Sequence, residues 1–108
     1  MSWSSIADMP TARYALAATS DANGNIYVIG GNDTNFNKVA TVEKWDGSSW
    51  SSLPDMPTVR YFVAGTSNSS GIYAIGGYNG NVLATVETFA ISTPSPPDPP
   101  SNLVATQQ

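Results

Sequence analysis

The sequence predicts an all-β fold in which a unit of short antiparallel strands occurs twice. The phrase Ile-Tyr-Val-Ile-Gly-Gly at residues 26–31 returns as Ile-Tyr-Ala-Ile-Gly-Gly at 72–77, and the stretch at 3–14 returns at 50–61. No window of the 108 residues shows a convincing helical period. The copies differ in length only in polar segments rich in Asn and Gly. The segments of constant length are therefore expected to be strands, and the others loops.

Four short strands are expected in the first repeat and three in the second. The predicted ranges are 14–19, 25–29, 39–45 and 50–53, and then 61–66, 71–75 and 83–89. The segments 21–24 and 46–49 contain Asn-Gly and Asp-Gly, which accept the positive φ of tight hairpin turns. A period of about 45 residues built of four strands is typical of a β-propeller blade. An additional outer strand is expected at 3–6, the copy of 50–53.

The paired glycines that end the second strand belong to a wider motif. An aromatic residue closes the third strand (Trp45 and Phe89), Trp50 opens the fourth, and Met-Pro-Thr-Xaa-Arg-Tyr precedes each inner strand. Over about residues 3–91 this pattern resembles the kelch repeat. The resemblance implies two four-stranded antiparallel propeller blades, the second lacking its outer strand. Trp45 and Phe89 stand where kelch repeats usually carry Tyr, so the aromatic side chain is kept without the phenol.

Two blades are too few to close a ring, because propellers use roughly four to eight. The open faces would expose apolar side chains in patches that monomers avoid. Two interpretations follow. The chain is a piece of a longer kelch protein, or copies of it assemble head to tail, with residues 3–6 completing the last blade of a neighbour. Three chains would then form a six-bladed propeller.

The carboxy-terminal part differs in composition from the repeats. Residues 1–92 are assigned to the kelch-type blades and 93–100 to a Pro-rich linker of extended polyproline type. Residues 101–108 resemble the first strand of a fibronectin type III domain, or else form a disordered tail. This resemblance implies a multidomain extracellular or cell-surface protein. The abundance of Ser, Thr, Asn and Gly with few Lys favours an exported bacterial one.

Charge and residue types exclude several functions. The net charge of −4, with four Lys and Arg residues, argues against nucleic-acid binding, which depends on clustered basic groups. No apolar run approaches the ~20 residues of a membrane span, and the sequence from Met1 does not resemble a signal peptide. The chain has no His and no Cys, so the usual general base, thiol nucleophile and preferred zinc or copper ligands are missing. We therefore expect no catalytic residue, cofactor or metal.

Arg13 and Arg60 occupy equivalent positions at the expected mouth of the propeller channel. The functional interpretation is an anion-binding ring. The structural interpretation is a guanidinium that ties the turn between blades, with Asp8 and Asp55 as partners. Because both copies carry the arginine, we favour the structural interpretation.

Glu43 and Glu87 also recur at one strand position. We interpret them as ion-pair partners between blades, of Arg13 or Arg60, rather than as a catalytic acid/base pair. The glycine pairs at 30–31 and 76–77 are not followed by the Lys-Ser/Thr or helix N-terminus of a phosphate loop. They are assigned to sharp turns and close packing.

The two copies diverge after the paired glycines, and this divergence points to ligand-binding loops. The candidate ligand-loop residues are Asn32, Asp33, Asn35, Phe36, Tyr78 and Asn79. Exposed aromatic and amide groups at loop tips commonly contact proteins or carbohydrates. The sequence thus favours a non-catalytic kelch module that binds a protein or glycan. The alternatives are the non-catalytic part of a propeller enzyme of the carbohydrate-active oxidase or lyase type, and a purely structural spacer.

Overall fold

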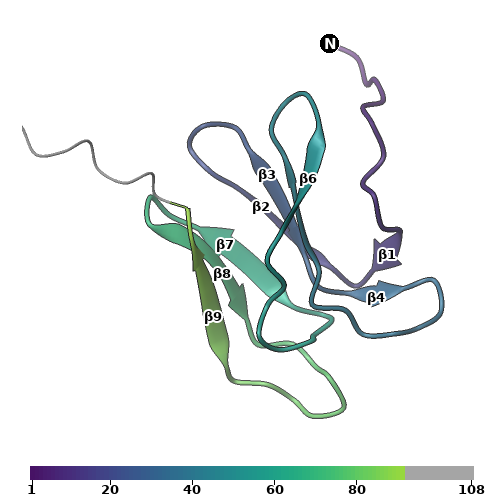
Figure 1. Ribbon diagram of the computed structural model, residues 1–108, viewed down its shortest axis with the longest axis vertical. Coiled ribbons are helices and arrows are strands. Elements are labelled where there is room, and N and C mark those ends of the chain that lie inside the picture. The colour runs from purple at the N-terminus through teal and green to yellow at the C-terminus, as the bar shows by residue number, and fades with distance from the viewer. Residues whose placement is uncertain (92–108) are drawn as a thin grey trace, which may run out of the picture.

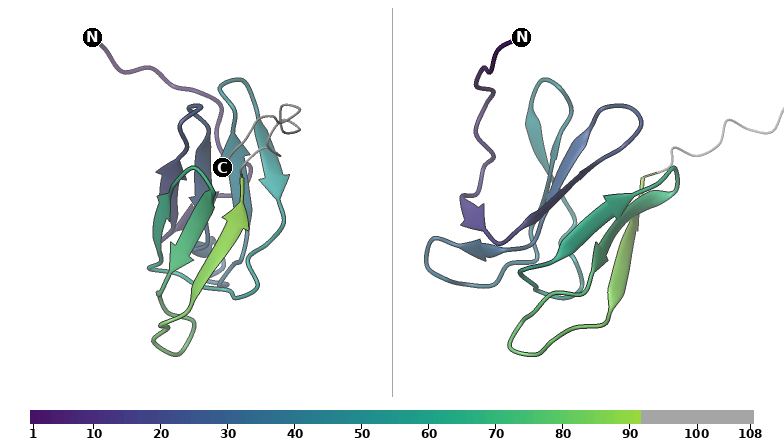
Figure 2. Two further views of the ribbon diagram at one scale, coloured as in Figure 1. Left: turned by 90° about the vertical axis from the view of Figure 1, so that its left-hand side faces the viewer. Right: turned by 180° about the vertical axis from the view of Figure 1, so that it is seen from behind.

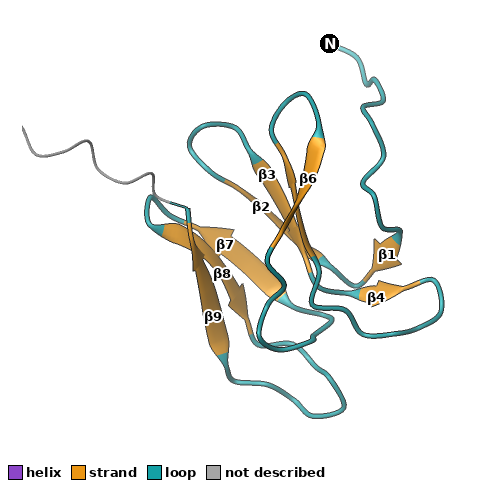
Figure 3. Ribbon diagram, viewed as in Figure 1, coloured by secondary structure: helices purple, strands orange, loops and turns teal. Residues whose placement is uncertain are grey.

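The computed structural model describes residues 1–91, and every regular element in that range is a β-strand (Figures 1 and 3). The strands are β1 (Arg13–Tyr14), β2 (Ala17–Ser20), β3 (Ile26–Ile29), β4 (Asn32–Asp33), β5 (Val42–Trp45), β6 (Trp50–Leu53), β7 (Ala64–Ser67), β8 (Gly71–Ile75) and β9 (Val86–Ala90). No helix within residues 1–91 is long and apolar enough to cross a membrane. The expected linker at 93–100 and the expected strand or tail at 101–108 lie outside the described residues.

Each repeat forms its own antiparallel sheet (Figures 1 and 2). The first sheet has the order β2-β3-β5-β6, and the second has the order β7-β8-β9. The prediction of an all-β fold with antiparallel sheets is confirmed. Within residues 1–91 the first sheet has one strand more than the second. The hairpin strand β6 has the predicted bounds.

The inner strand of each repeat is shorter than predicted, because the backbone turns before it. Ala15 and Phe62 are equivalent residues with φ of 58° and 52°, in the left-handed region that L-residues rarely adopt. This turn separates β1 from β2, and β1 instead pairs with β4, a strand that the sequence did not predict.

Two other predicted elements also differ in the structure. The third strands begin later than expected, at Val42 and Val86. Residues 3–6, expected as an additional outer strand, form no strand in the described chain (Figure 3). They form no ladder with β6, the edge strand of the first sheet, although the following part of the segment approaches it, since Trp50 Nε1 donates to the carbonyl oxygen of Ala7 at 2.9 Å.

The hydrophobic core lies between the two sheets. Its buried members come from both repeats and are Tyr27, Ile29, Val42, Val63, Ile72 and Ala74. The inner strands β2 and β7 approach closely because Gly65 has no side chain. A Cβ at that position would lie 3.2 Å from Ala17 Cβ and 3.2 Å from Ile29 Cδ1. Burial of these side chains between the sheets is the main favourable term of the fold.

The glycine pair after β3 brings the backbones of different segments together. Gly31 has a φ of 102°, and a Cβ there would lie 2.6 Å from the carbonyl oxygen of Tyr14. Its N–H donates to the carbonyl oxygen of Arg60 at 2.9 Å, which links the first repeat to the second. Both the backbone angle and the space therefore require glycine.

The β2–β3 hairpin is organised by the side chain of Asp21. Its Oδ1 accepts the backbone N–H groups of Asn23 and Asn25, and its Oδ2 accepts the Asn25 amide at 2.9 Å and the Tyr27 hydroxyl at 2.7 Å. Burial alone raises the pKa of Asp21, but these hydrogen bonds outweigh it and lower the pKa to about 2. Burial, followed by the hydrogen bond to Asp21, raises the pKa of Tyr27 to about 12.

Gly31→Ala should destabilise the fold by about 2 kcal/mol more than Gly47→Ala. Gly47 has a similar φ of 99°, but a Cβ added there would meet nothing within 4 Å, so its substitution costs only the strain of the left-handed conformation, about 1–2 kcal/mol. Urea unfolding of both variants measures the difference. Equal losses of stability would show that the contact with Tyr14 is not a packing constraint.

Asp21→Asn should lower the free energy of unfolding at neutral pH by about 1–2 kcal/mol, because hydrogen bonds to a charged acceptor are lost. The folded-state pKa of Asp21 lies below its unfolded value of about 3.9. Its contribution is therefore present above about pH 4 and is lost as the pH falls towards 2.

The variant should accordingly lose less stability than the wild type over that acidic range. Unfolding curves at several pH values measure this slope. Asp8→Asn, which removes an exposed carboxylate outside the hairpin, is the control. A slope that is the same in wild type and Asp21→Asn would contradict the assignment.

Candidate functional site

Arg13 lies at the centre of a buried polar cluster. Its side chain is fully buried, and Nη1 donates to the carbonyl oxygens of Gly30 and Thr41 at 2.9 and 2.8 Å. Nη2 donates to Glu43 Oε1 at 2.7 Å, and Glu43 Oε2 accepts a hydrogen bond from the Thr11 hydroxyl at 2.9 Å. One guanidinium therefore joins β1 to the end of β3 and the start of β5 through charge-assisted hydrogen bonds.

Arg60 repeats this arrangement in the second sheet. Its side chain is also fully buried, and Nη1 donates to the carbonyl oxygens of Gly76 and Thr85 at 2.8 and 2.9 Å. Nη2 lies 2.8 Å from Glu87 Oε1, and the Thr58 hydroxyl donates to Glu87 Oε2. The recurring Thr, Arg and Glu thus form one structural unit in each repeat.

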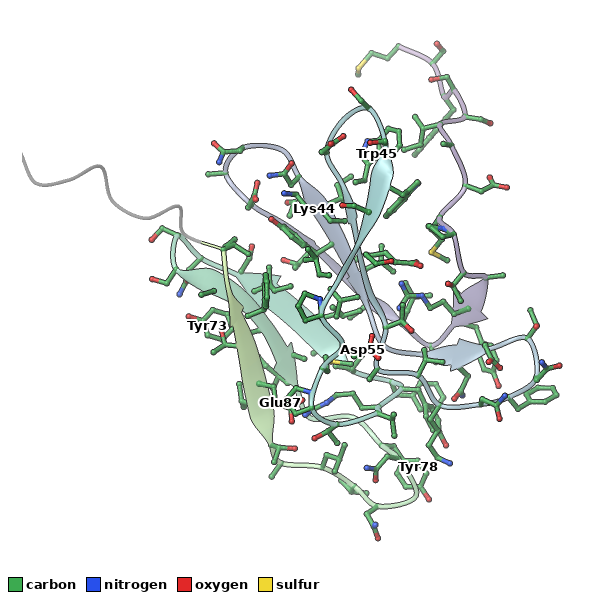
Figure 4. The ribbon with its side chains drawn as sticks, viewed as in Figure 1. Lys44, Trp45, Asp55, Tyr73, Tyr78 and Glu87 are labelled. Atoms are coloured by element: carbon green, nitrogen blue, oxygen red, sulfur yellow. The ribbon has the colours of Figure 1, made fainter. Side chains whose placement is uncertain are left out.

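The two carboxylates differ in their surroundings. The Glu43 side chain is 2% exposed and that of Glu87 is 18% exposed. Within residues 1–91, Glu87 Oε1 has no aligned hydrogen bond despite its ion pair with Arg60. Glu43 pairs in the sheet with Ser52 on β6, whereas β9, which carries Glu87, is the last strand of its sheet (Figure 4).

The interpretation of the repeated glutamates as ion-pair partners of the arginines is confirmed, but the expectation that these pairs connect neighbouring blades was wrong, since each glutamate pairs with the arginine of its own repeat. The expected partners Asp8 and Asp55 were wrong. In the described part of the chain, neither forms an ion pair with an arginine. The guanidinium groups lie inside the protein, and they hold strand ends together there.

The loop after β4 presents an aromatic side chain to solvent. Asp33 Oδ1 accepts the backbone N–H groups of Asn35 and Asn37 at 2.9 and 3.0 Å, an Asx turn that shapes residues 33–37. The hydrogen bond from Asn37, followed by that from Asn35, lowers the pKa of Asp33 below its usual range. Phe36 at the tip is 77% exposed, with a φ of 65°. Asn35 is exposed as well, whereas Asn32, the first residue of β4, is buried.

The corresponding loop of the second repeat carries Tyr78 and Asn79. The backbones of Tyr78 and Tyr61 exchange hydrogen bonds of 2.9 and 3.0 Å, and their rings pack edge to face with centroids 5.5 Å apart. Asn79 Oδ1 accepts the N–H of Asn81 at 3.3 Å, so this amide shapes the loop. Tyr78 is 38% exposed and lies at the lower end of the molecule in Figure 4.

Both loops project from the same end of the molecule, opposite the hairpins β2–β3 and β5–β6 (Figures 1 and 2). Tyr14 packs against Phe36 at 6.3 Å and Phe62 packs against Tyr61 at 5.0 Å, measured between ring centroids. A hydrogen bond of 2.8 Å from the Phe62 N–H to the Ala15 carbonyl connects the two groups. We call the five rings the aromatic loop surface: Tyr14, Phe36, Tyr61, Phe62 and Tyr78.

Sequence reasoning identified Phe36 and Tyr78 but assigned the other three rings to strands. The missed signal is the Arg-Tyr pair that ends the repeated Met-Pro-Thr-Xaa-Arg-Tyr motif. The buried arginine fixes the backbone, and the left-handed residue that follows the tyrosine turns the chain at this end. Phe62 occupies that strained position and its side chain is exposed, which is the kind of outlier that clusters at functional sites.

A cavity of about 210 Å³ lies between the two sheets. Its walls include the core residues Ile29 and Val42, the segment 54–57, and the β9 residues Glu87 and Phe89. The volume is below the roughly 300–1,000 Å³ of ligand pockets. Nor do three or more acidic side chains come together within residues 1–91 in a way that could hold a metal ion.

Glu43→Gln should lower the free energy of unfolding by about 3–5 kcal/mol, because it leaves the buried Arg13 charge without its counter-ion. Asp55→Asn removes an exposed carboxylate without an ion pair in the described chain and should change stability by less than about 0.5 kcal/mol. Chemical denaturation of both variants measures the contrast. A small effect of Glu43→Gln would rule out the buried pair as the organising contact of the first sheet.

The residues predicted for the loops therefore divide into exposed groups and groups that shape the loop. Asn35, Phe36 and Tyr78 present atoms to solvent, while Asp33 and Asn79 stabilise turns. No protein-family model and no curated protein matches the chain. The function is accordingly inferred from the residues and their arrangement.

Proposed function

We propose that the two sheets are adjacent blades of a kelch-type propeller and that the chain is a non-catalytic binding module. Its ligand, a protein or a glycan, binds to the aromatic loop surface. The sequence resemblance and the two sheets of matching strand order support the blade assignment. The supporting observation for binding is the gathering of five aromatic rings on one loop end, three of them outside the hydrophobic core and clearly exposed: Tyr14, Phe36 and Phe62.

The chemistry of this surface suits a ligand that combines apolar faces with hydrogen-bonding groups. Exposed aromatic rings offer a large contact area at a small cost in side-chain entropy, which is why they are enriched at binding sites. Asn35, which precedes Phe36 in the chain, is also exposed. A sugar ring has apolar C–H faces and peripheral hydroxyl groups, and a protein loop offers a similar mixture.

The different roles of the residues that repeat and the residues that diverge between the copies support the same function. The repeated arginines are fully buried, and each is paired with the glutamate of its repeat in a structural contact. The two most exposed rings of the aromatic loop surface, Phe36 and Phe62, stand at positions that differ between the copies. Loops held by a rigid scaffold are where binding residues concentrate.

Phe36→Ala and Tyr78→Ala should each weaken binding in a glycan array or a pull-down by at least about tenfold, the loss typical of a ring at the centre of an interface. Phe62→Ala is expected to have a similar effect. Since Phe36 and Phe62 are mostly exposed, their substitution should leave the unfolding midpoint nearly unchanged, so that lost binding is not lost folding.

Ser48→Ala is the matched control, because Ser48 is an exposed residue in the β5–β6 hairpin at the other end of the molecule (Figure 1). It should not change binding. A ligand that binds Ser48→Ala, Phe36→Ala and Tyr78→Ala equally well would remove the assignment of the aromatic loop surface. A chain that binds neither proteins nor glycans would favour the structural spacer.

A further inference from the structure

One face of the second sheet is exposed although its equivalent in the first sheet is buried. Ile29 and Val42, which pair across β3 and β5, face the second sheet and are 1% and 3% exposed. Their equivalents in the repeat, Ile75 and Val86, pair in the same way across β8 and β9 but are 41% and 57% exposed. The second sheet therefore exposes a surface that is equivalent to the one by which the first sheet packs against it.

The outer face of the first sheet is the matching surface. Ile72 belongs to the core between the sheets and is 3% exposed, whereas its equivalent Ile26 is 37% exposed. Ile26 pairs with Trp45 across β3 and β5, just as Ile72 pairs with Phe89. The chain thus carries both halves of its own internal sheet-to-sheet contact, unoccupied, on its two ends.

The first sheet also shows how the edge of the second would be completed. β6 lies antiparallel to β5, with Leu53 opposite Val42 and Trp50 opposite Trp45. The two tryptophan rings pack with centroids 5.5 Å apart. This contact defines a register for an outer strand.

The repeat places residues 3–6 in the same register against β9. Ile6 would lie opposite Val86, and Trp3 opposite Phe89, if residues 3–6 paired as 50–53 do. All four of these side chains are exposed. The amino-terminal segment and β9 lie on opposite sides of the molecule (Figures 1 and 2), so the segment that reaches β9 must come from a second copy.

Polar groups at the same boundary agree with this placement. The Gly31 N–H donates to the Arg60 carbonyl across the two repeats at 2.9 Å. The equivalent N–H of Gly77 has no such acceptor within residues 1–91. In a head-to-tail pair, the carbonyl of Arg13 from the next copy, the equivalent of Arg60, would stand in that place.

We propose that copies of this chain assemble head to tail by strand addition. Residues 3–6 of one copy pair antiparallel with β9 of the next, and the outer face of the first sheet covers Ile75 and Val86 of that neighbour. The added strand also extends the wall of the cavity beside Glu87. Three copies supply six sheets, within the roughly four to eight of a closed propeller, and closing the ring covers the exposed sheet faces of every copy. This inference rests on the equivalence of the repeats and does not depend on which ligand the loops bind.

Cysteine cross-linking of the full chain tests the register directly, because the chain contains no cysteine of its own. Ser51 pairs with Lys44 in the first sheet, so the register places Ser4 opposite Thr88 of a neighbour. The double variant Ser4→Cys with Thr88→Cys should form intermolecular disulfides under mild oxidation, since directly opposed strand residues have the required separation. Ser4→Cys with Val82→Cys is the matched control, because Val82 is highly exposed but lies outside β9.

Light scattering coupled to size exclusion gives the second readout. The full chain should have the mass of a discrete oligomer of the 11.3 kDa chain, with the trimer expected. Val86→Lys should shift that mass to the monomer, and Val82→Lys should not. Trp3→Ala should also dissociate the ring, and its circular dichroism spectrum should retain the β signal because Trp3 is fully exposed within one chain.

A single-chain mass at every concentration, with no disulfide in the Ser4/Thr88 pair, would overturn the proposal. An oligomer that persists in both Trp3→Ala and Val86→Lys would overturn it as well, because a different surface would then hold the copies together. Loop substitutions such as Phe36→Ala should leave the mass unchanged, so the outcome is separate from that of ligand binding.

Discussion

The buried pair of Arg13 and Glu43, with its copy Arg60 and Glu87, is the interaction on which the rest of the structure depends. Each guanidinium binds two backbone carbonyls from strand ends as well as the carboxylate. In this way it joins the segment before the inner strand of each sheet to the glycine turn that follows β3 or β8. The short strands alone, of two to five residues, make few ladder hydrogen bonds, so the polar cluster does much of the positioning.

A buried charge is costly unless an opposite charge and hydrogen bonds compensate it, because removing it from water costs several kcal/mol. That condition explains why Thr, Arg and Glu recur together. The hydroxyls of Thr11 and Thr58 occupy the second carboxylate oxygen that the guanidinium leaves free. The same cluster fixes the tyrosine after each arginine, and with it one part of the aromatic loop surface. Structural and binding residues therefore share one short motif.

The two repeats have the same plan but different neighbours, and this accounts for most of the differences between them. Glu43 is covered because β6 completes its sheet, and Glu87 is partly open because β9 is an edge. Apolar faces and unpaired edges are sites of association in β-proteins. In this chain, the residues of the exposed faces are equivalent to the residues that pack between the two sheets. The association is thus expected to be specific rather than indiscriminate.

The repeat, the all-β class, the order of the main strands and the partnership of arginine with glutamate could be predicted from the sequence, because these depend on local periodicity, turn chemistry and recurrence. The positions where the inner strands break could not be predicted in this way. The left-handed backbone at Ala15 follows the pairing of β1 with β4, and that at Phe62 follows the bridge between Tyr61 and Tyr78, since neither residue favours it locally. The gathering of Tyr14, Tyr61 and Phe62 with the predicted Phe36 and Tyr78 follows from that turn. It joins residues distant in the chain, and no local pattern encodes such a juxtaposition.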